Sequence, residues 1–293
     1  KRDGQTDFAY AIAGVGRFRV NVFLQRGTCA AVMRCLPFEI PQPETLGIPK
    51  EVVEITSRKR GLVLVTGPTG SGKSTTLASL IHVINQNYPY HIITLEDPIE
   101  YLHRHDKSIV NQREIGSDSM DYAQALRAAL REDPDVILVG EMRDLETIST
   151  AITAAETGHL VFSTLHTTGA DQTLDRIIDV FPPDQQQQIR IQLAAVLECI
   201  VSQQLLKRAD GQGRVAALEV LFANNAIRNL IREGKTYQIP SVMQTSKRLG
   251  MQTMDDALYD LYMRKIIDAD EAVTYAQDPV SMNKKVTFDL PDF

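Results

Sequence analysis

The amino-acid sequence predicts an α/β protein whose parallel sheet is covered by helices on both faces. The short apolar runs "LVLVT", "HIITL", "VILVG" and "HLVFSTL" are typical of strands, and helical patterns lie between them. Strands that are apolar throughout, rather than alternating, indicate a sheet buried on both faces. The first run passes through a glycine-rich turn directly into an amphipathic helix, with Leu77, Leu80, Ile81 and Ile84 at helical spacing.

Changes in pattern divide the chain into segments. Residues 1–36 alternate apolar and polar side chains, as in "GRFRVNVFLQRG", and predict the later strands of a small domain. Residues 37–49 hold several closely spaced prolines, which favour an extended linker. Residues 50–222 carry the strand–helix alternation of the core, and residues 223–293 are mainly helical in pattern.

Composition argues against several classes of protein. The formal net charge of the 293 residues is -6, which does not favour a dedicated nucleic-acid binder because such proteins usually carry a basic face. The three cysteines form no CxxC pair, so neither a disulfide framework nor a zinc knuckle is expected. No apolar run is long enough to span a membrane as a helix.

The stretch "VLVTGPTGSGKSTTLASL" predicts a phosphate-binding loop. It satisfies the pattern GxxxxGK[ST], in which glycines turn backbone N–H groups toward an anion and the following helix adds its positive end. Lys73 should reach the β- and γ-phosphates, and the Ser74 hydroxyl should help to hold Mg²⁺. The predicted nucleotide-binding residues of the loop are Gly67, Pro68, Thr69, Gly70, Ser71, Gly72, Lys73, Ser74 and Thr75.

Carboxylates follow two of the predicted strands. Glu96 and Asp97 come directly after "HIITL", Glu100 lies four residues beyond Glu96, and Glu141 follows "VILVG". Ligands of open α/β sheets bind at the carboxyl edge, where these side chains would lie. The alternative is that acidic residues stand at strand ends because they are solvated there.

Two histidines bracket the run "HLVFSTLH". A histidine near a strand is usually a hydrogen-bonded structural residue. Because His159 and His166 stand at opposite ends of the run, only one is expected to face the nucleotide. His166, at the carboxyl edge, is favoured, and its imidazole could sense the γ-phosphate.

Together these stretches resemble one family. "GPTGSGKSTT", "TLEDPIEY", "LREDPDVILVGEMRD" and "TGHLVFSTLHT" are similar to the Walker A, Asp box, Walker B and His box of the secretion ATPases of type II secretion, type IV pilus and type IV secretion systems. "AIRNLIRE" and "GMQTMD" resemble the pilus-retraction branch of that family. The tetracysteine zinc motif of pilus-assembly ATPases is absent from the sequence, which also favours retraction.

The resemblance implies a homohexameric motor that hydrolyses ATP with Mg²⁺ to power type IV pilus retraction. Each subunit would consist of a PAS-like N-terminal domain, a RecA-like P-loop ATPase domain and a helical C-terminal region. Residues 1–36 would form only the later strands of the PAS-like domain. The implied partners are an inner-membrane, PilC-like platform protein and the pilus machinery, without nucleic acid. The implied location is cytoplasmic, at the inner face of the cytoplasmic membrane.

The resemblance also implies residue roles. Glu100 is expected to orient the attacking water, Glu96 and Asp97 to support Mg²⁺ and its waters, and Glu141 to take the Walker B position, preceded by Gly140 in place of the usual aspartate. The expected arginines that neutralise phosphate charge are Arg17, Arg19 and Arg34. The segment expected to couple the ring to the pilus comprises Ala226, Ile227, Arg228, Asn229, Leu230, Ile231, Arg232 and Glu233.

Other functions stay open at the level of sequence. Within the family, the closest alternative is the accessory retraction paralogue, and another secretion-system ATPase is a further one. A P-loop kinase would need an acceptor pocket and a lid rich in arginine, and no such lid is evident in the sequence. A RecA-like DNA-handling protein would need basic loops with interleaved aromatic residues, and none is evident.

Overall fold

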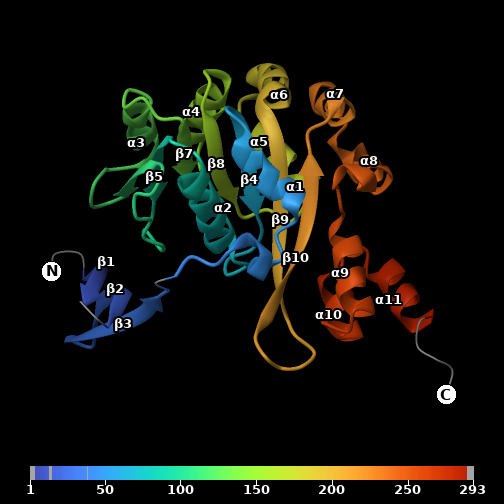
Figure 1. Ribbon diagram of the computed structural model, residues 1–293, viewed down its shortest axis with the longest axis horizontal. Coiled ribbons are helices and arrows are strands. Elements are labelled where there is room, and N and C mark those ends of the chain that lie inside the picture. The colour runs from blue at the N-terminus through green and yellow to red at the C-terminus, as the bar shows by residue number, and fades with distance from the viewer. Residues whose placement is uncertain (1–3, 13–14, 38, 289–293) are drawn as a thin grey trace.

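Two β-sheets organise the structure, a computed structural model that describes residues 4–12, 15–37 and 39–288 (Figure 1). The strands are β1 (Gln5–Ile12), β2 (Gly16–Gln25), β3 (Thr28–Leu36), β4 (Gly61–Thr66), β5 (His91–Glu96), β6 (Ile109–Glu114), β7 (Val136–Val139), β8 (Leu160–Leu165), β9 (Leu197–Lys207) and β10 (Arg214–Phe222). The small sheet is antiparallel, in the order β1–β2–β3. The large sheet has the order β10–β9–β4–β8–β7–β5–β6 and is parallel except for β10.

Helices cover both faces of the large sheet and form the C-terminal region. The helices are α1 (Lys50–Val53), α2 (Lys73–Asn87), α3 (Tyr122–Ala129), α4 (Leu145–Glu156), α5 (Ala170–Asp179), α6 (Pro183–Val196), α7 (Asn225–Glu233), α8 (Ile239–Thr245), α9 (Met254–Met263), α10 (Ala269–Tyr275) and α11 (Pro279–Phe288). The small sheet and the helices α9–α11 lie toward opposite ends of the molecule (Figure 1). In the part of the chain that the structure describes, no helix combines the length and apolarity that a membrane crossing needs.

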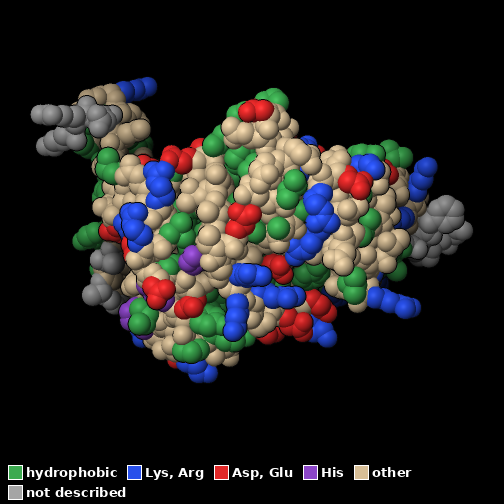
Figure 2. Space-filling model, turned by 90° about the horizontal axis from the view of Figure 1, so that it is seen from above, with side chains coloured by type: hydrophobic (Ala, Val, Ile, Leu, Met, Phe, Trp, Pro, Cys, Tyr) green, Lys and Arg blue, Asp and Glu red, His purple; other side chains and the backbone are tan. Residues whose placement is uncertain are grey.

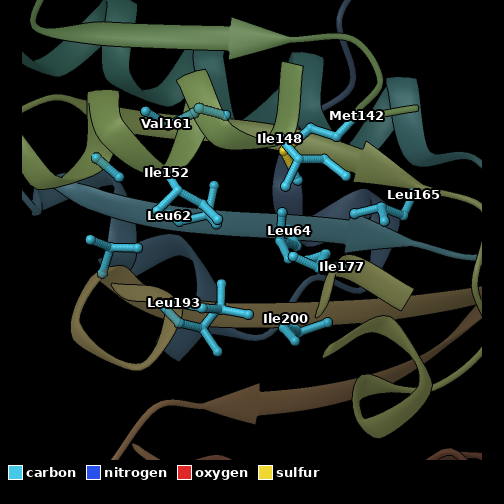
Figure 3. Close-up of a cluster of buried hydrophobic side chains, with 14 of the residues drawn as sticks. Leu62, Leu64, Met142, Ile148, Ile152, Val161, Leu165, Ile177, Leu193 and Ile200 are labelled. Atoms are coloured by element: carbon cyan, nitrogen blue, oxygen red, sulfur yellow. The ribbon is translucent and has the colours of Figure 1, made fainter. Parts of the chain in front are cut away.

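Strand β4 shows why the sheet is buried on both faces. Its side chains alternate between the faces because successive residues of a strand point in opposite directions. Leu62 and Leu64 pack with α4, α5 and α6 in the cluster of Figure 3. Val63 and Val65 join the cluster formed by the apolar face of α2. Every residue of the strand is buried, as its uninterrupted apolar sequence predicts.

The predicted fold class is confirmed. The four apolar runs are β4, β5, β7 and β8, and the helical pattern after Lys73 is α2. Strands β6, β9 and β10 had not been predicted. The sequence of β6, "IVNQRE", is polar because this strand is the edge of the sheet and carries exposed residues. Strand β9 begins at the residue after α6 ends, so no turn residue marks the change from helix to strand.

The C-terminal helices have a hydrophobic core of their own. Leu206 of β9 and Ala217 of β10 pack with Met254 and Leu258 of α9, and α10 and α11 complete the cluster. The β9–β10 hairpin reaches beyond the other strands toward these helices (Figure 1). The hairpin therefore connects the large sheet to the C-terminal region by direct packing as well as by chain connectivity.

Candidate nucleotide-binding and catalytic site

The phosphate-binding loop lies between β4 and α2, and Lys73 is the first residue of that helix. Its ammonium Nζ donates to the carbonyl oxygens of Gly67 (2.8 Å) and Pro68 (3.0 Å), and only 8% of the residue is exposed. Burial lowers the pKa of Lys73, while the charges of Glu141 and Glu100 act to raise it. A cation held against the loop and close to carboxylates is placed to receive the phosphates of a nucleotide.

The remaining residues of the predicted loop differ in exposure. Ser71 is buried, and Thr75 Oγ1 lies 3.0 Å from the hydroxyl oxygen of Tyr101. The exposed positions are Pro68, Thr69, Gly70 and Ser74. A ligand could therefore reach the backbone of the turn and the hydroxyl group at the start of α2.

Gln203 of β9 supports the loop from behind, and sequence analysis missed it. Its side-chain Nε2 donates to the carbonyl oxygen of Ser71 (2.6 Å), and its Oε1 accepts from Thr76 Oγ1 (2.8 Å). A Cβ atom added at Gly67 would lie 2.2 Å from the Gln203 carbonyl oxygen, and one at Gly72 would lie 2.8 Å from its Nε2. The glycines of the loop thus allow close approach of β9. The available signal was the polar stretch "SQQ" between the apolar pairs "IV" and "LL".

The structure brings His166 and Glu141 to the loop. His166 Nδ1 lies 3.4 Å from Lys73 Nζ and 3.5 Å from Thr69 Oγ1, and its Nε2 lies 3.4 Å from Glu141 Oε1. Because an ammonium group can only donate, Nδ1 must accept from Lys73, which leaves the ring proton on Nε2, facing the carboxylate. Glu141 Oε2 also pairs with Arg143 at 2.7 Å. Burial acts to raise the pKa of Glu141, but the hydrogen bond and charge of Arg143 bring it below its ordinary value.

His159 lies at the opposite end of β8, before its first residue. Its Nδ1 is 2.9 Å from the carbonyl oxygen of Ala154 and 3.4 Å from Thr157 Oγ1. These contacts secure the turn between α4 and β8. The structure therefore places one histidine of the pair against the phosphate-binding loop and the other in a structural turn.

Gly140 stands where a standard Walker B sequence has aspartate, and the packing explains the difference. A Cβ atom there would lie 2.7 Å from the Tyr122 hydroxyl oxygen and 3.0 Å from the carbonyl oxygen of Leu95. A side chain there would have to displace the Tyr122 hydroxyl and would be tight against the carbonyl oxygen of Leu95. Glu141 is consequently the first carboxylate after β7.

The acidic residues after β5 occupy different environments. Glu96 Oε1 accepts from Thr94 Oγ1 (2.7 Å) and Gln112 Nε2 (3.0 Å), and burial raises the pKa of Glu96 against the effect of these hydrogen bonds. Asp97 is exposed and Glu100 is half-buried. Among the described residues no side chain donates a hydrogen bond to the Glu100 carboxylate. Glu96 is thus fixed, whereas Glu100 keeps both oxygens available.

The residues at this edge fit a magnesium ion bound together with a nucleotide. The hydroxyl of Ser74 and the carboxylates of Asp97 and Glu141 offer the oxygen ligands that Mg²⁺ prefers. Within residues 4–12, 15–37 and 39–288 no group of three or more His, Cys, Asp or Glu side chains could hold a metal by itself. Magnesium bound with a nucleotide usually takes most of its ligands from phosphates and water.

The three arginines of the small sheet are not equivalent. Arg19 of β2 lies directly opposite Arg34 of β3, and neither forms an ion pair with another described residue. Like charges at opposite positions destabilise a sheet, and an anion between them would relieve the repulsion. Arg17 instead donates from Nη1 to the carbonyl oxygen of Ile99 (2.8 Å) and lies 3.6 Å from Glu114.

The segment "AIRNLIRE" forms most of α7. Ile227 and Ile231 are fully buried in the main core, and Leu230 packs against it while partly exposed. The helix therefore has an apolar face that packs on the core. Asn229 and Glu233 pair with each other on the helix surface (2.8 Å), and Arg232 is exposed beside them.

Arg228 does not point into solvent, because its guanidinium is engaged by neighbouring elements. Its guanidinium donates to the carbonyl oxygens of Ala194 (2.6 Å) and Ala195 (2.9 Å) at the end of α6, and to that of Ala223 (2.9 Å). It also pairs with Glu198 at 3.0 Å. Carbonyl groups at a helix end lack partners within the helix, so Arg228 satisfies them and fixes α7 to α6.

The loop, its lysine and the carboxylates at the ends of β5 and β7 define a P-loop nucleotide-binding protein built on a parallel α/β sheet. A family model described as "Type II/IV secretion system protein" matches residues 17–274. The chain therefore belongs to the type II/IV secretion system protein family, as its motifs predicted.

Relatives with assigned names are similar over most of the chain. A "Twitching motility protein" of Neisseria gonorrhoeae is 53% identical over 95% of this chain and 75% of its own length. In Pseudomonas aeruginosa, the "Type IV pilus retractation ATPase PilT" is 51% identical over 94% of this chain and 80% of its own length, and the "Type IV pilus ATPase PilU" is 44% identical over 93% and 71%. The solved "Crystal Structure of the Pilus Retraction Motor PilT and Bound ADP" matches with a TM-score of 0.91 and 58% identity over 96% of this chain and 80% of that one.

Proposed function

We propose that this protein is the motor ATPase that retracts type IV pili. The observation that carries the proposal is the 51% identity, over 94% of the chain, to a relative named as a type IV pilus retraction ATPase. The site supports it, because the loop, Lys73 and the carboxylates supply what ATP hydrolysis requires. The protein would act as a homohexamer at the inner face of the cytoplasmic membrane, against a PilC-like platform protein.

The proposed chemistry assigns one task to each group. The loop and Lys73 hold the phosphates, and Glu100 orients the attacking water. Ser74, Asp97 and Glu141 would hold Mg²⁺ and its waters, and Glu96 would support them. When bound, the ion would neutralise the negative charge that develops on the phosphates. His166, between Lys73 and Glu141, would respond to the γ-phosphate by hydrogen bonding.

The alternative functions named from the sequence have less support than pilus retraction. The accessory retraction paralogue has less support, since PilU is 44% identical where PilT of the same organism is 51% identical. The relatives give no support to a P-loop kinase or a RecA-like DNA-handling protein. The face in Figure 2 carries basic and acidic side chains side by side, rather than the continuous basic surface that binds single-stranded DNA.

Two measurements test the proposal together. Purified protein with ATP and Mg²⁺ alone should release phosphate without an acceptor or DNA, and light scattering should detect a hexamer. Expression in a bacterium that lacks its retraction ATPase should restore twitching. Dependence on an acceptor would favour a kinase, and turnover without restored twitching would favour the accessory paralogue.

Arg19→Ala and Arg34→Ala should slow hydrolysis more than they weaken nucleotide binding. The positive charge of these side chains matters most as negative charge develops on the transferred phosphoryl group. Steady-state kinetics combined with ADP and ATP affinities check this prediction. Equal losses of ADP and ATP affinity with an unchanged rate would show that both arginines are ordinary solvated residues.

Arg232→Ala should separate hydrolysis from retraction. We propose that the exposed surface of α7 transmits ring movement to the pilus machinery, and this side chain is exposed on it. The variant should keep its hexamer and its ATPase rate while cells that carry it lose retraction. Arg228→Ala is the contrasting variant, because it removes the hydrogen bonds that fix α7 to α6 and should lower the melting temperature. Retraction that survives Arg232→Ala would show that the exposed side of the helix is not the coupling surface.

A further inference from the structure

Arg17 forms a closed network with a loop that follows β5. Its Nη1 donates to the carbonyl oxygen of Ile99 at 2.8 Å, and its Nη2 lies 3.6 Å from Glu114 Oε2. The same Oε2 atom accepts the backbone N–H of Ile99 at 3.1 Å. Both backbone polar groups of Ile99 are therefore satisfied by one ion pair. The side chains of Arg17 and Glu114 are 14% and 12% exposed, so solvent screens this pair less than a surface pair.

The residue held in this way directly precedes Glu100. On the other side of Glu100, Tyr101 is fixed to the core: its hydroxyl lies 3.0 Å from Thr75 Oγ1, and its carbonyl oxygen accepts from Gln112 Nε2 (2.8 Å). One side of Glu100 is thus secured entirely by the ATPase core. The other side is secured jointly by Glu114 of β6 and by Arg17, which belongs to the small sheet.

We infer that Arg17 is a positioning residue, which aligns Glu100 for hydrolysis when the small sheet lies against the loop after β5. This inference rests on the proposed role of Glu100. It gives Arg17 a different task from Arg19 and Arg34, which have no ion-pair partner among the described residues. Movement of the small sheet away from the core would break the hydrogen bond from Arg17 to Ile99 and leave this side of the segment that carries Glu100 held by Glu114 alone.

Arg17→Gln should lower kcat by about 10- to 100-fold, because small displacements of a group that orients a reactant have effects of this size. The affinity for a fluorescent ADP analogue should stay within about 2-fold of wild type, since Arg17 contacts protein groups rather than phosphate in this arrangement. Hydrogen exchange of the peptide that contains residues 97–103 should become faster without nucleotide. Arg17→Lys keeps the charge and one donor, and should recover part of the rate.

A double-mutant cycle separates this role from phosphate binding. If Arg17 acts through Glu100, Arg17→Gln should cause no further loss in the Glu100→Gln background. Glu114→Gln should reproduce the effect on kcat and on exchange. Arg26→Gln, in the exposed turn of the same sheet, is the matched control and should leave both unchanged.

Three results would overturn the inference: additive losses in the double variant, an ADP affinity that falls in parallel with kcat, or unchanged exchange at residues 97–103. Failure of the proposed function would give a different result. The wild-type protein would then lack acceptor-independent ATP turnover, or would fail to restore pilus retraction in cells. The exchange measurement needs no turnover, so it tests the contact even in that case.

Discussion

Lys73→Ala is expected to abolish ATP hydrolysis and to weaken nucleotide binding below detection. The ammonium group is the only described lysine cation inside the phosphate-binding loop, held by the carbonyl oxygens of Gly67 and Pro68. Its removal takes the lysine charge away from the phosphates, and takes the ammonium donor away from His166 Nδ1. Phosphate release and binding of a fluorescent ATP analogue are the measurements.

The matched control for this prediction is Lys59→Ala. Lys59 is exposed in the segment before β4, and its loss changes the net charge by the same amount. The control should hydrolyse ATP like wild type. Turnover that survives Lys73→Ala would show that the nucleotide does not bind in this loop.

Glu100→Gln is expected to leave ATP binding intact and to slow hydrolysis by about 10² to 10⁴-fold, the range typical for a lost acid–base group. The amide keeps the shape of the side chain but loses the charge that aligns the attacking water. Single-turnover hydrolysis, together with ATP affinity, checks both parts of the prediction.

Glu96→Gln is the informative comparison. The Glu96 carboxyl already accepts two hydrogen bonds through one oxygen, and burial raises its pKa. An amide can preserve those two bonds through its own oxygen, so the loss of rate should be smaller than for Glu100→Gln. If Glu96→Gln is the more damaging change, the roles assigned to these two carboxylates are reversed.

The parts of the fold that were predictable from sequence are those with a strong local signal. Strands β4, β5, β7 and β8 lie inside the sheet and are apolar throughout, and the glycine-rich loop has a fixed spacing. Strand β6 lies at an edge and β9 follows α6 without a break, so neither has a distinctive local pattern. Their positions are decided by pairing with strands distant in sequence, which periodicity does not detect.

The same distinction applies to the candidate site. The sequence placed Lys73, Glu141 and His166 at one edge of the sheet, because each follows a predicted strand. It could not distinguish Arg17 from Arg19, because both lie on the same face of β2. Their contacts differ because Ile99, which is distant in sequence, lies beside Arg17. Nor could it reveal that Arg228 satisfies the end of α6, because a helical pattern does not show which charged side chains turn toward a neighbouring helix.

The support that Gln203 gives to the phosphate-binding loop connects that loop with distant parts of the chain. Strand β9 continues from this residue into the hairpin on which α9, α10 and α11 pack. A tilt of the hairpin would therefore displace the loop. The displacement would pass through the two hydrogen bonds of Gln203 and through its close contacts with Gly67 and Gly72. The C-terminal helices are in this way mechanically linked to the phosphate-binding loop through one continuous strand.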